Sequence, residues 1–383
     1  MTPARPRDTA TEPQAETNET AVLVIDLDAL VANYRHLRDL AGTAECAAVV
    51  KADAYGLGMV QAAAALWRAG CKTFFVATLA EAMALRRLLP EAIIYDLNGL
   101  MPGTAETFRE FNLRPVLNSA DEIREWAAFC ARVGEAPCAV HIDSGMNRLG
   151  LTFDDVETVA DARDLWAAFA LSLVMSHLAC ADEPEHAKNE AQRRTFDELR
   201  ARLPSALTSL ANSAGIMLGP DFVYDLVRPG IALYGGHPQR VGPNPFRTVV
   251  HLKGRILQVR EVAPGETLGY GATRTLQRPS RIATVSVGYA DGLFRTLSRG
   301  DGEQGPVVHL GDHAAPILGR VSMDLITVDV TGIPETLARR GGWVEVLGPN
   351  TSAHELAAHA GTIDYEVLTA LSQRALRRYI GGS

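Results

Sequence analysis

The sequence has no run of about 18 consecutive apolar residues, the length that a membrane-spanning helix requires. Its first twenty residues lack the apolar core of a secretory signal peptide, and their polar composition predicts a disordered tail over residues 1–20. The five cysteines are odd in number, widely spaced and form no C-x-x-C pair, which indicates reduced thiols. These absences predict a cytoplasmic protein.

Motifs for nucleotides and metals are also missing. The segment GLGMVQ lacks the third glycine of a dinucleotide-binding loop, and no G-x-x-x-x-G-K-[ST] pattern occurs. His354, Glu355 and His359 resemble a zinc-binding H-E-x-x-H motif, but the two histidines are five positions apart. On a helix they would diverge by about 140° and could not share one metal. The sequence therefore supports no metal, NAD or nucleotide site.

Positive charge is not in excess: 37 Lys and Arg residues stand against 45 Asp and Glu residues, and the isoelectric point is about 5.7. This balance argues against a nucleic-acid-binding surface and favours a small-molecule partner. Apolar residues make up 47% of the chain and charged residues 21%, an ordinary globular composition. A chain of 383 residues is too long for one ordinary domain.

Between about residues 45 and 235, short apolar runs alternate with amphipathic segments that have a helical period. One amphipathic segment opens with Ser119 and has Glu122 three positions later, the pattern of a capping box. Repeated strand–helix alternation predicts a (β/α)8 barrel of the TIM type, which we place at residues 21–245. The eight predicted strands are AAVVK, TFFVAT, AIIYDL, RPVLN, CAVHID, LSLVMSH, LTSLANS and LVRPGIALYG.

The character of the sequence changes after about residue 245. Short β-branched runs are broken by Gly and Pro, a pattern typical of strands joined by turns. We therefore predict a second, mainly β domain over residues 246–383. It includes a short helix for which Ser352 is a suitable N-cap.

Several of the eight barrel runs end in polar residues. In a barrel of this type the chemistry takes place at the carboxyl ends of the strands. These side chains are therefore candidates for binding an anion and for supplying a reactive base: Lys51, Asp143, His177, Asn212, Ser213 and Arg228.

Lys51 allows two interpretations. It could be an exposed lysine just beyond a buried strand, which is the common situation for lysine. Alternatively, partial desolvation could lower the pKa of its amine so that it attacks a carbonyl. The surrounding sequence has to decide between them.

The chain resembles the alanine racemase family in eight segments that occur in the same order. The resemblance runs from about residue 21 to the C-terminus, and it implies a pyridoxal 5′-phosphate (PLP) enzyme with a barrel, a β domain and a homodimer that shares active sites. The segments are VVKADAYGLG with Lys51, HIDSGMNRLG with Arg148, NSAG with Ser213, VRPGIALYG with Arg228, LGYGATRTL with Tyr270, and VGYADG, GRVSMD and TIDYEV.

Racemisation removes the Cα proton of an amino acid and returns one to the opposite face, so it needs an electron sink and two bases. The resemblance implies that Lys51 binds PLP covalently and serves as one base. Tyr270 of the partner subunit would be the other, and its alternative role is that of a half-buried strand aromatic.

Arg228 resembles the arginine that donates to the pyridine nitrogen of PLP. Arginine cannot accept the ring proton, because its pKa exceeds about 12, so the electron sink would be weak. His177 resembles the histidine that supports this arginine. An ordinary salt-bridged arginine and a satisfied core histidine are the alternatives.

The resemblance assigns the cofactor phosphate to hydroxyl and backbone N–H groups. Ser213, Gly230 and Ile231 end the seventh and eighth runs, and Tyr55 and Tyr365 resemble two tyrosines that complete the site. Phosphate commonly binds the loops after strands seven and eight of such barrels. Both tyrosines could instead be rim aromatics.

The substrate carboxylate would be bound near Arg148 and by the backbone N–H of Met323 from the partner subunit. Tyr289, Asp324 and Arg274 would line the access channel. A pocket formed by Tyr270, Met323 and Tyr365 would favour alanine, yet apolar pockets reject an added hydroxyl poorly, so some serine turnover is expected.

His141 departs from the family pattern. Many alanine racemases have a lysine here, and its carbamate orients the arginine that corresponds to Arg148. A histidine cannot form that carbamate, so Arg148 would need a bound anion, a neighbouring carboxylate or no partner at all. Asn147, where glycine is common, is a smaller departure.

Three other functions fit parts of this pattern. A broader amino-acid (serine) racemase would use the same residues. A PLP-dependent decarboxylase shares the two-domain plan, although its glycine-rich phosphate loop and active-site cysteine pattern are not evident. A PLP-binding protein without activity would lack the β domain and hence Tyr270.

Overall fold

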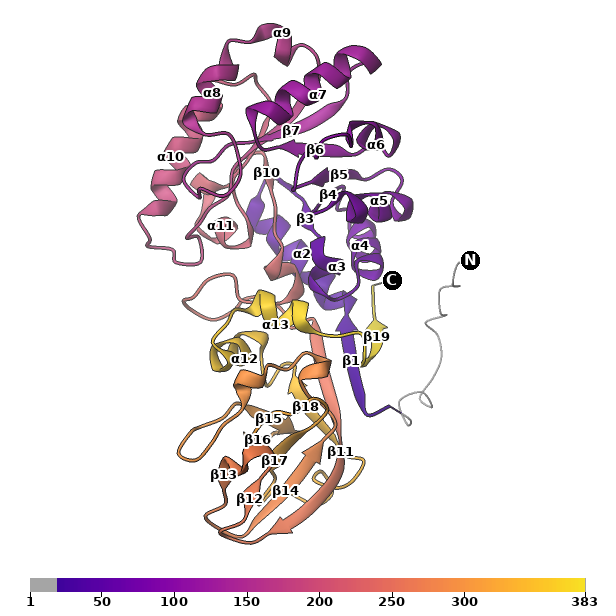
Figure 1. The fold of residues 1–383 in the computed structure, drawn as a ribbon, viewed down its shortest axis with the longest axis vertical. Coiled ribbons are helices and arrows are strands. Elements are labelled where there is room, and N and C mark those ends of the chain that lie inside the picture. Colours follow the sequence, from indigo (N-terminus) through magenta and orange to yellow (C-terminus); the bar gives the residue numbers. More distant parts are fainter. Residues whose placement is uncertain (1–18, 383) are drawn as a thin grey trace. The chain divides into compact units, whose positions relative to one another are not determined.

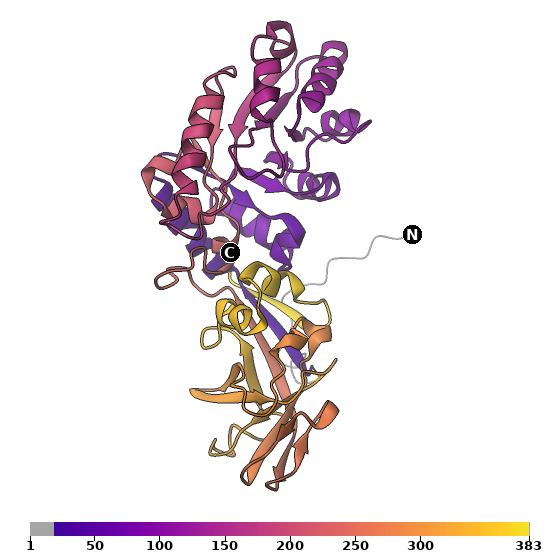
Figure 2. The same ribbon diagram turned by 60° about the vertical axis from the view of Figure 1, so that its left-hand side comes forward.

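The computed structural model describes residues 19–382. The chain forms two compact units. One contains residues 30–246, and the other combines residues 19–29 with residues 247–382. Figure 1 and Figure 2 show the elements of each unit, which are described separately below.

The first unit is built on parallel strands that coincide with the eight predicted runs. Seven form one sheet in chain order, and each pairs in parallel with the next. Their central residues are buried on both sides, which explains why they read as continuous apolar runs. The strands are β3 (Ala48–Val49), β4 (Thr73–Val76), β5 (Ile93–Asp96), β6 (Arg114–Leu117), β7 (Pro137–His141), β8 (Ala170–Met175) and β9 (Leu207–Ser209).

An eighth strand closes the sheet into a barrel. β10 (Leu226–Val227) pairs in parallel with β2 (Glu45–Cys46), which leads directly into β3. On its other side, the Arg228 N–H donates to the Ala211 carbonyl at 2.9 Å, just beyond β9. The predicted (β/α)8 barrel is therefore confirmed.

Helices surround these strands (Figure 1). Four begin with a side-chain cap: Thr78, Ser119, Thr152 and Asn212 each accept a backbone N–H in the first turn. The helices are α2 (Leu27–Ala41), α4 (Met59–Arg68), α5 (Leu79–Leu88), α6 (Ala105–Glu110), α7 (Ala120–Val133), α8 (Phe153–Ala160), α9 (Arg163–Trp166), α10 (Lys188–Arg200) and α11 (Ser213–Met217).

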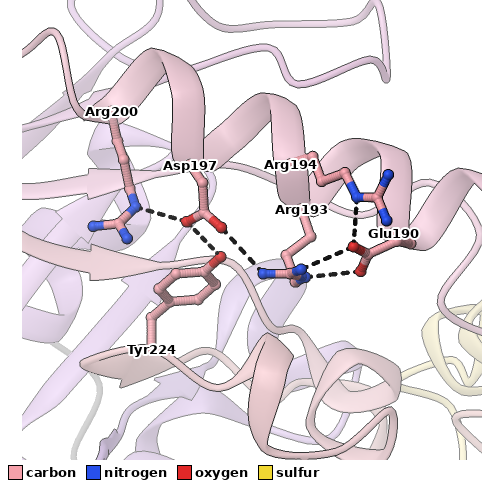
Figure 3. Close-up of polar contacts among 6 residues, drawn as sticks. All are labelled: Glu190, Arg193, Arg194, Asp197, Arg200 and Tyr224. Carbon is pink, nitrogen blue, oxygen red and sulfur yellow. Dashed lines mark hydrogen bonds and ion pairs between the residues drawn. The ribbon is translucent and has the colours of Figure 1, made fainter.

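One ion-pair network joins α10 to the segment that leads into β10. Arg193 bridges Glu190 and Asp197 along one face of the helix (Figure 3). Asp197 also accepts a hydrogen bond from the Tyr224 hydroxyl at 2.9 Å, and Arg200 donates to the same carboxylate. The network therefore ties a helix to the strand that closes the barrel.

The second unit is mainly β, as predicted. Its eight-stranded sheet has the order β14-β17-β16-β15-β18-β11-β1-β19, and a further pairing of β14 with β11 closes part of it. The long strand β11 serves both pairings: its first half joins β1 and β18, and its second half joins β14. The strands are β1 (Ala21–Asp26), β11 (Val250–Val262), β14 (Ser280–Val285), β15 (Val307–Leu310), β16 (His313–Leu318), β17 (Ile326–Asp329), β18 (Trp343–Leu347) and β19 (Leu376–Ile380).

Shorter elements complete this unit. A small hairpin of β12 (Thr267–Leu268) and β13 (Arg274–Thr275) flanks the single turn η3 (Tyr270–Ala272). The helix α12 (Ala353–Ala360) begins at the predicted cap Ser352, whose hydroxyl accepts the Glu355 N–H. The turn η4 (Tyr289–Asp291) and the helix α13 (Asp364–Ala370) carry further predicted site residues.

The predicted start of the barrel at residue 21 is wrong. β1 pairs antiparallel with β11 and in parallel with β19, so residues 21–26 belong to the β unit. An apolar run such as AVLVID fits either unit by composition, and only its hydrogen-bond partners decide. The tail predicted over residues 1–20 lies outside the described residues except for its last two. No helix within residues 19–382 is long and apolar enough to cross a membrane.

Candidate active site

Lys51 lies at the carboxyl end of the first barrel strand, where the backbone makes a left-handed turn. Ala52, Asp53, Ala54 and Tyr55 have φ values between 52° and 57°, although none is glycine. This conformation costs about 1–2 kcal/mol for each L-residue, and such strain is typical of functional sites. Hydrogen bonds hold the turn: the Ala54 N–H donates to Val50 O at 2.9 Å and the Gly56 N–H to Ala52 O at 2.7 Å.

The Lys51 amine is partly withdrawn from water. Burial lowers the pKa of Lys51, the positive charge of Arg148 lowers it further, and the carboxylate of Glu81 opposes both effects. A larger fraction of neutral amine is therefore present near neutral pH than on an exposed lysine. Such an amine can act as a nucleophile or a base.

Arg228 is buried at the same end of the barrel, with 3% of its surface exposed. Its guanidinium donates to the Ser209 hydroxyl and, at 2.6 Å, to the Ser176 carbonyl. No carboxylate forms an ion pair with it within residues 19–382. Burial lowers the pKa of Arg228 to about 9. The interpretation of Arg228 as an ordinary salt-bridged arginine therefore does not hold within this chain.

His177 follows β8. Burial lowers the pKa of His177 well below its usual value, and the charges of Arg228 and Arg148 lower it further. The imidazole is therefore neutral near pH 7. Its carbonyl accepts a hydrogen bond from Gln192 at 3.0 Å, which fixes the backbone of this loop.

His141, the departure from the family pattern, is buried at the end of β7. Its Nδ1 lies 2.8 Å from the Asn118 side-chain oxygen. The Asn118 amide nitrogen donates to the carbonyls of Val116 at 2.7 Å and Leu97 at 3.4 Å, so its oxygen faces the histidine. An acceptor oxygen at Nδ1 requires the imidazole proton to be there, which leaves Nε2 as an acceptor. Burial, reinforced by Arg228, lowers the pKa of His141 to about 4.

Arg148 is exposed on the loop after β7. Asp143 organises this loop by accepting the N–H groups of Gly145, Met146 and Asn147 at 2.8–3.1 Å. Asn147 has a φ of 56°, a left-handed conformation that asparagine tolerates. Among residues 19–382 no carboxylate pairs with Arg148. Of the three alternatives for the partner of Arg148, the described residues exclude a carboxylate of the same chain. A bound anion and no partner at all are left.

The residues predicted for a phosphate converge after strands β9 and β10. The Ser213 hydroxyl accepts the N–H of Gly230 at 2.9 Å and of Ala232 at 3.3 Å. A Cβ built on Gly230 would lie 2.1 Å from the Tyr55 hydroxyl, so position 230 has no room for a side chain while Tyr55 stays in place. Ile231 begins the helical turn η2 (Ile231–Tyr234), whose first N–H groups have no partner within the turn. Hydroxyl and backbone donors therefore meet in one place.

The remaining predicted residues lie in the β unit. Tyr270, in η3, is 73% exposed, and Met323 is 53% exposed. Tyr289 is close to Met323, because the N–H of Ala290 donates to the Met323 carbonyl at 3.0 Å. Tyr365 lies on α13 with part of its ring exposed. Tyr289 and Met323 thus expose neighbouring large side chains, which is typical of interaction surfaces.

The predicted rim residues Asp324 and Arg274 are held in place by their own contacts. Arg374 donates to Asp324 at 2.5 Å and makes a two-pronged ion pair with the buried Asp291 at 2.6 and 2.7 Å. Arg274 donates to the Gly300 carbonyl at 2.8 Å. Within the described chain these two residues therefore stabilise loops of the β unit.

The barrel end thus combines a desolvated amine, a buried guanidinium without a carboxylate among residues 19–382, neutral histidines and a group of hydroxyl and backbone N–H groups. Its basic residues suit a ligand with several negative charges. The family model for the alanine racemase N-terminal domain matches residues 25–238, and that for the C-terminal domain matches residues 249–379. The chain belongs to the alanine racemase family.

Relatives support this assignment over nearly the full length. The chain is 50% identical over 373 residues to an alanine racemase of Methylobacterium sp. (strain 4-46), covering 97% of this chain and all of that one. It is 49% identical over 370 residues to one of Rhodospirillum rubrum, covering 96% and 97%. The crystal structure of the alanine racemase of Bartonella henselae, which has covalently bound pyridoxal phosphate, shares 40% identity. It superimposes with a TM-score of 0.89 and covers 94% of this chain and 99% of that one.

Several residues of this alanine racemase site were not anticipated from the sequence. Asn118, which orients His141, reads as an ordinary residue after a strand. Asp96 ends β5 as a buried carboxyl group, and burial raises its pKa to about 7. Glu81 contacts the turn after Lys51. Only Glu81 had a sequence signal, since Thr78 and Glu81 form a T-x-x-E capping pattern.

Proposed function

We propose that this protein is a PLP-dependent alanine racemase that interconverts L-alanine and D-alanine. The observation that carries the proposal is the presence of Lys51 and Arg228 at the same end of the barrel. One supplies an amine with a lowered pKa, and the other a buried cation that no carboxylate among residues 19–382 neutralises. Family membership and the relatives named alanine racemase support the same reaction.

The donor set fits pyridoxal 5′-phosphate. Lys51 would bind it covalently, Arg228 would donate to its ring nitrogen, and the phosphate would be held by Ser213, Gly230, Ile231, Tyr55 and Tyr365. The close approach of the Tyr55 hydroxyl to Gly230 supports the phosphate assignment, because a side chain at Gly230 would fill that space. When bound, PLP supplies the electron sink that makes the Cα proton of the substrate acidic.

The chain's own residues would then move the proton. Burial and the charge of Arg148 favour the neutral form of the Lys51 amine, which can accept the Cα proton from one face. Tyr270 would act on the other face. Its 73% exposure within one chain supports a role in the active site of a partner subunit. Arg228 would leave the ring nitrogen unprotonated, since a guanidinium does not accept a proton.

Substrate binding would fall to Arg148 and to the backbone N–H of Met323, with His177, His141, Tyr289 and Asp324 in supporting positions. The exposed side chains of Tyr270 and Met323 favour a homodimer in which each chain completes the site of the other. A cytoplasmic racemase of this kind would supply D-alanine for peptidoglycan.

Incubation of purified protein and PLP with L-alanine, followed by separation of the enantiomers, tests this function. D-alanine should accumulate to a nearly equal mixture without release of carbon dioxide. Tyr270→Phe should abolish most of the activity while PLP still binds, because it removes the base of one face but no cofactor contact. An absence of D-alanine at saturating PLP would refute the proposal, and release of carbon dioxide would indicate a decarboxylase.

The two faces provide a sharper test of the bases. Lys51 should take the proton from D-alanine and Tyr270 from L-alanine. In single-turnover exchange of the Cα proton, Tyr270→Phe should therefore slow exchange from L-alanine more than from D-alanine. Equal losses for both enantiomers would contradict the assignment. A low rate with serine is expected, and a serine rate above the alanine rate would favour the broader amino-acid racemase.

A further inference from the structure

Glu81 lies in α5, the helix that follows β4, and contacts the backbone directly after Lys51. One carboxylate oxygen accepts the Ala52 N–H at 2.6 Å. The other accepts the N–H groups of Ala77 at 2.9 Å and Thr78 at 3.3 Å, at the end of β4. One side chain therefore joins the loops that follow the first and second barrel strands.

The Ala52 N–H marks the start of the strained turn. Val50 still has a negative φ of −118°, whereas Ala52 is the first residue with a positive φ. Ala54, Gly56 and Leu57 donate their N–H groups to the carbonyls of Val50, Ala52 and Ala54, and the Asp53 side chain accepts the N–H of Met59, the first residue of α4, at 2.7 Å. The contact with Glu81 is thus the hydrogen bond that the turn receives at its beginning from another element. A hydrogen bond to a carboxylate is about twice as strong as one between neutral groups.

We propose that Glu81 is the positioning residue of Lys51: it holds the left-handed turn at its first N–H and sets the direction in which the amine enters the site. The inference rests on the proposed function for its consequence in catalysis. The hydrogen bonds of Glu81 described above go to backbone N–H groups of the two loops, so we infer that it acts on the site through Lys51.

Charge supports the same role. Two charged groups act on the Lys51 amine, the guanidinium of Arg148 and the carboxylate of Glu81. Glu81 is the negative one, and it counteracts burial and the charge of Arg148, which both lower the pKa of Lys51. Removal of its charge should therefore lower the pKa of Lys51 further.

The barrel contains a second contact of this kind. Glu122 occupies the same third position of its helix, and its carboxylate accepts the N–H groups of Leu100 at 3.0 Å and Asn118 at 3.1 Å. It joins the loops after β5 and β6. The arrangement of Glu81 is therefore a structural device of this barrel, and at Glu81 the joined loop is the one that bears Lys51.

The test compares Glu81→Gln and Glu81→Ala with the matched control Glu355→Gln. Glu355 is also the third residue of a capped helix, and its carboxylate accepts the Ser352 N–H at 2.7 Å, but α12 belongs to the β unit. A glutamine has one acceptor oxygen and cannot accept from both loops at once. Its NH2 group would face a backbone N–H instead.

The first measurement is independent of activity. The full-length chain without added PLP is labelled with trace acetic anhydride across a pH series, and the acetylation of Lys51 is followed by mass spectrometry. The pH midpoint of Lys51 labelling should fall in both Glu81 variants and stay at the wild-type value in Glu355→Gln. Equal midpoints in all four proteins would overturn the proposal. A wild-type chain that forms no D-alanine would count against the proposed function alone, because the labelling still reports on Glu81.

The second measurement uses the holoenzyme. Misplacement of a reacting group by about 1 Å can cost a factor of about 100. We therefore expect kcat to fall by roughly tenfold to a hundredfold in Glu81→Ala, with KM for alanine changed less than about threefold. The loss in Tm should match that of Glu355→Gln. A loss in Tm with wild-type kcat would show that Glu81 only caps α5.

Discussion

Asp96 shows how one buried carboxyl group affects the whole barrel. It is 2% exposed at the end of β5, and it accepts a hydrogen bond from the Asn98 N–H at 3.1 Å. Burial, with a smaller contribution from the charge of Glu81, raises the pKa of Asp96 to about 7, although the hydrogen bond from Asn98 acts in the opposite direction. The folded state therefore binds this proton more tightly than the unfolded chain, in which the pKa is near 3.8. The resulting stability is complete below about pH 4 and is lost as pH rises through about 7.

Asp96→Asn should remove this pH dependence. The amide keeps an acceptor for Asn98 but carries no charge, so the variant should be more stable than the wild type above pH 7, by at most a few kcal/mol. At pH 4 the two proteins should unfold at nearly the same denaturant concentration. Urea titrations at pH 4, 6 and 8 measure this difference. A variant that is less stable at pH 8 would contradict the predicted ionisation of Asp96.

His141 makes a prediction for NMR. The contact with the Asn118 oxygen places the proton on Nδ1, and the pKa of His141 is lowered to about 4. In 15N-labelled protein, His141 should remain neutral, with the proton on Nδ1, down to about pH 5. Asn118→Leu removes the acceptor and should allow the other tautomer. The alternative is that an anion bound beside Arg148 determines the state of His141. A shift of the His141 signals on chloride titration would favour this alternative.

At the scale of elements, the network on α10 should contribute measurably to stability. Tyr224→Phe removes one partly buried hydrogen bond to Asp197, which typically costs about 1 kcal/mol. Arg194→Ala removes an exposed ion pair from the same helix and should cost less, because solvent screens it. Chemical denaturation of both variants compares the two costs. Equal losses would show that Tyr224 does not couple α10 to the barrel closure.

Most elements of the barrel could be predicted because each strand is a short apolar run with turn residues on both sides. The caps were only partly predictable. Ser119 does cap α7, but the Glu122 carboxylate binds Leu100 and Asn118 instead of completing a capping box with Ser119. That choice depends on a loop about twenty residues away, which helix patterns do not contain.

The left-handed turn after Lys51 could not be predicted from its own residues. Alanine, aspartate and tyrosine prefer the right-handed or extended regions, so the local sequence indicates no such turn. It is stabilised by contacts with later parts of the chain, such as Glu81. The site residues named by resemblance could be predicted from the sequence. Asp96 and Asn118 could not, because their roles depend on burial and on contacts with neighbouring strands.

For the whole molecule, the proposed sharing of active sites between two subunits predicts complementation. Lys51→Ala and Tyr270→Phe should each be inactive as homodimers. In a dimer containing one chain of each kind, one site would carry both changes and the other neither. Mixing equal amounts and allowing subunits to exchange should therefore restore about a quarter of the wild-type activity, since about half of the dimers are mixed. A mixture without activity, despite demonstrated exchange, would place Lys51 and Tyr270 of one chain in the same site.

The position of β1 has a consequence for synthesis of the chain. Its parallel partner β19 begins at Leu376, and Val22 pairs with that residue. A ribosome adds about 5–20 residues each second, so β1 leaves it roughly 20–70 s before β19 exists. Through that interval the apolar strand has an unpaired edge, while the complete barrel sequence emerges behind it. Among residues 19–382 the β unit is therefore completed after the barrel, although β1 is made before it.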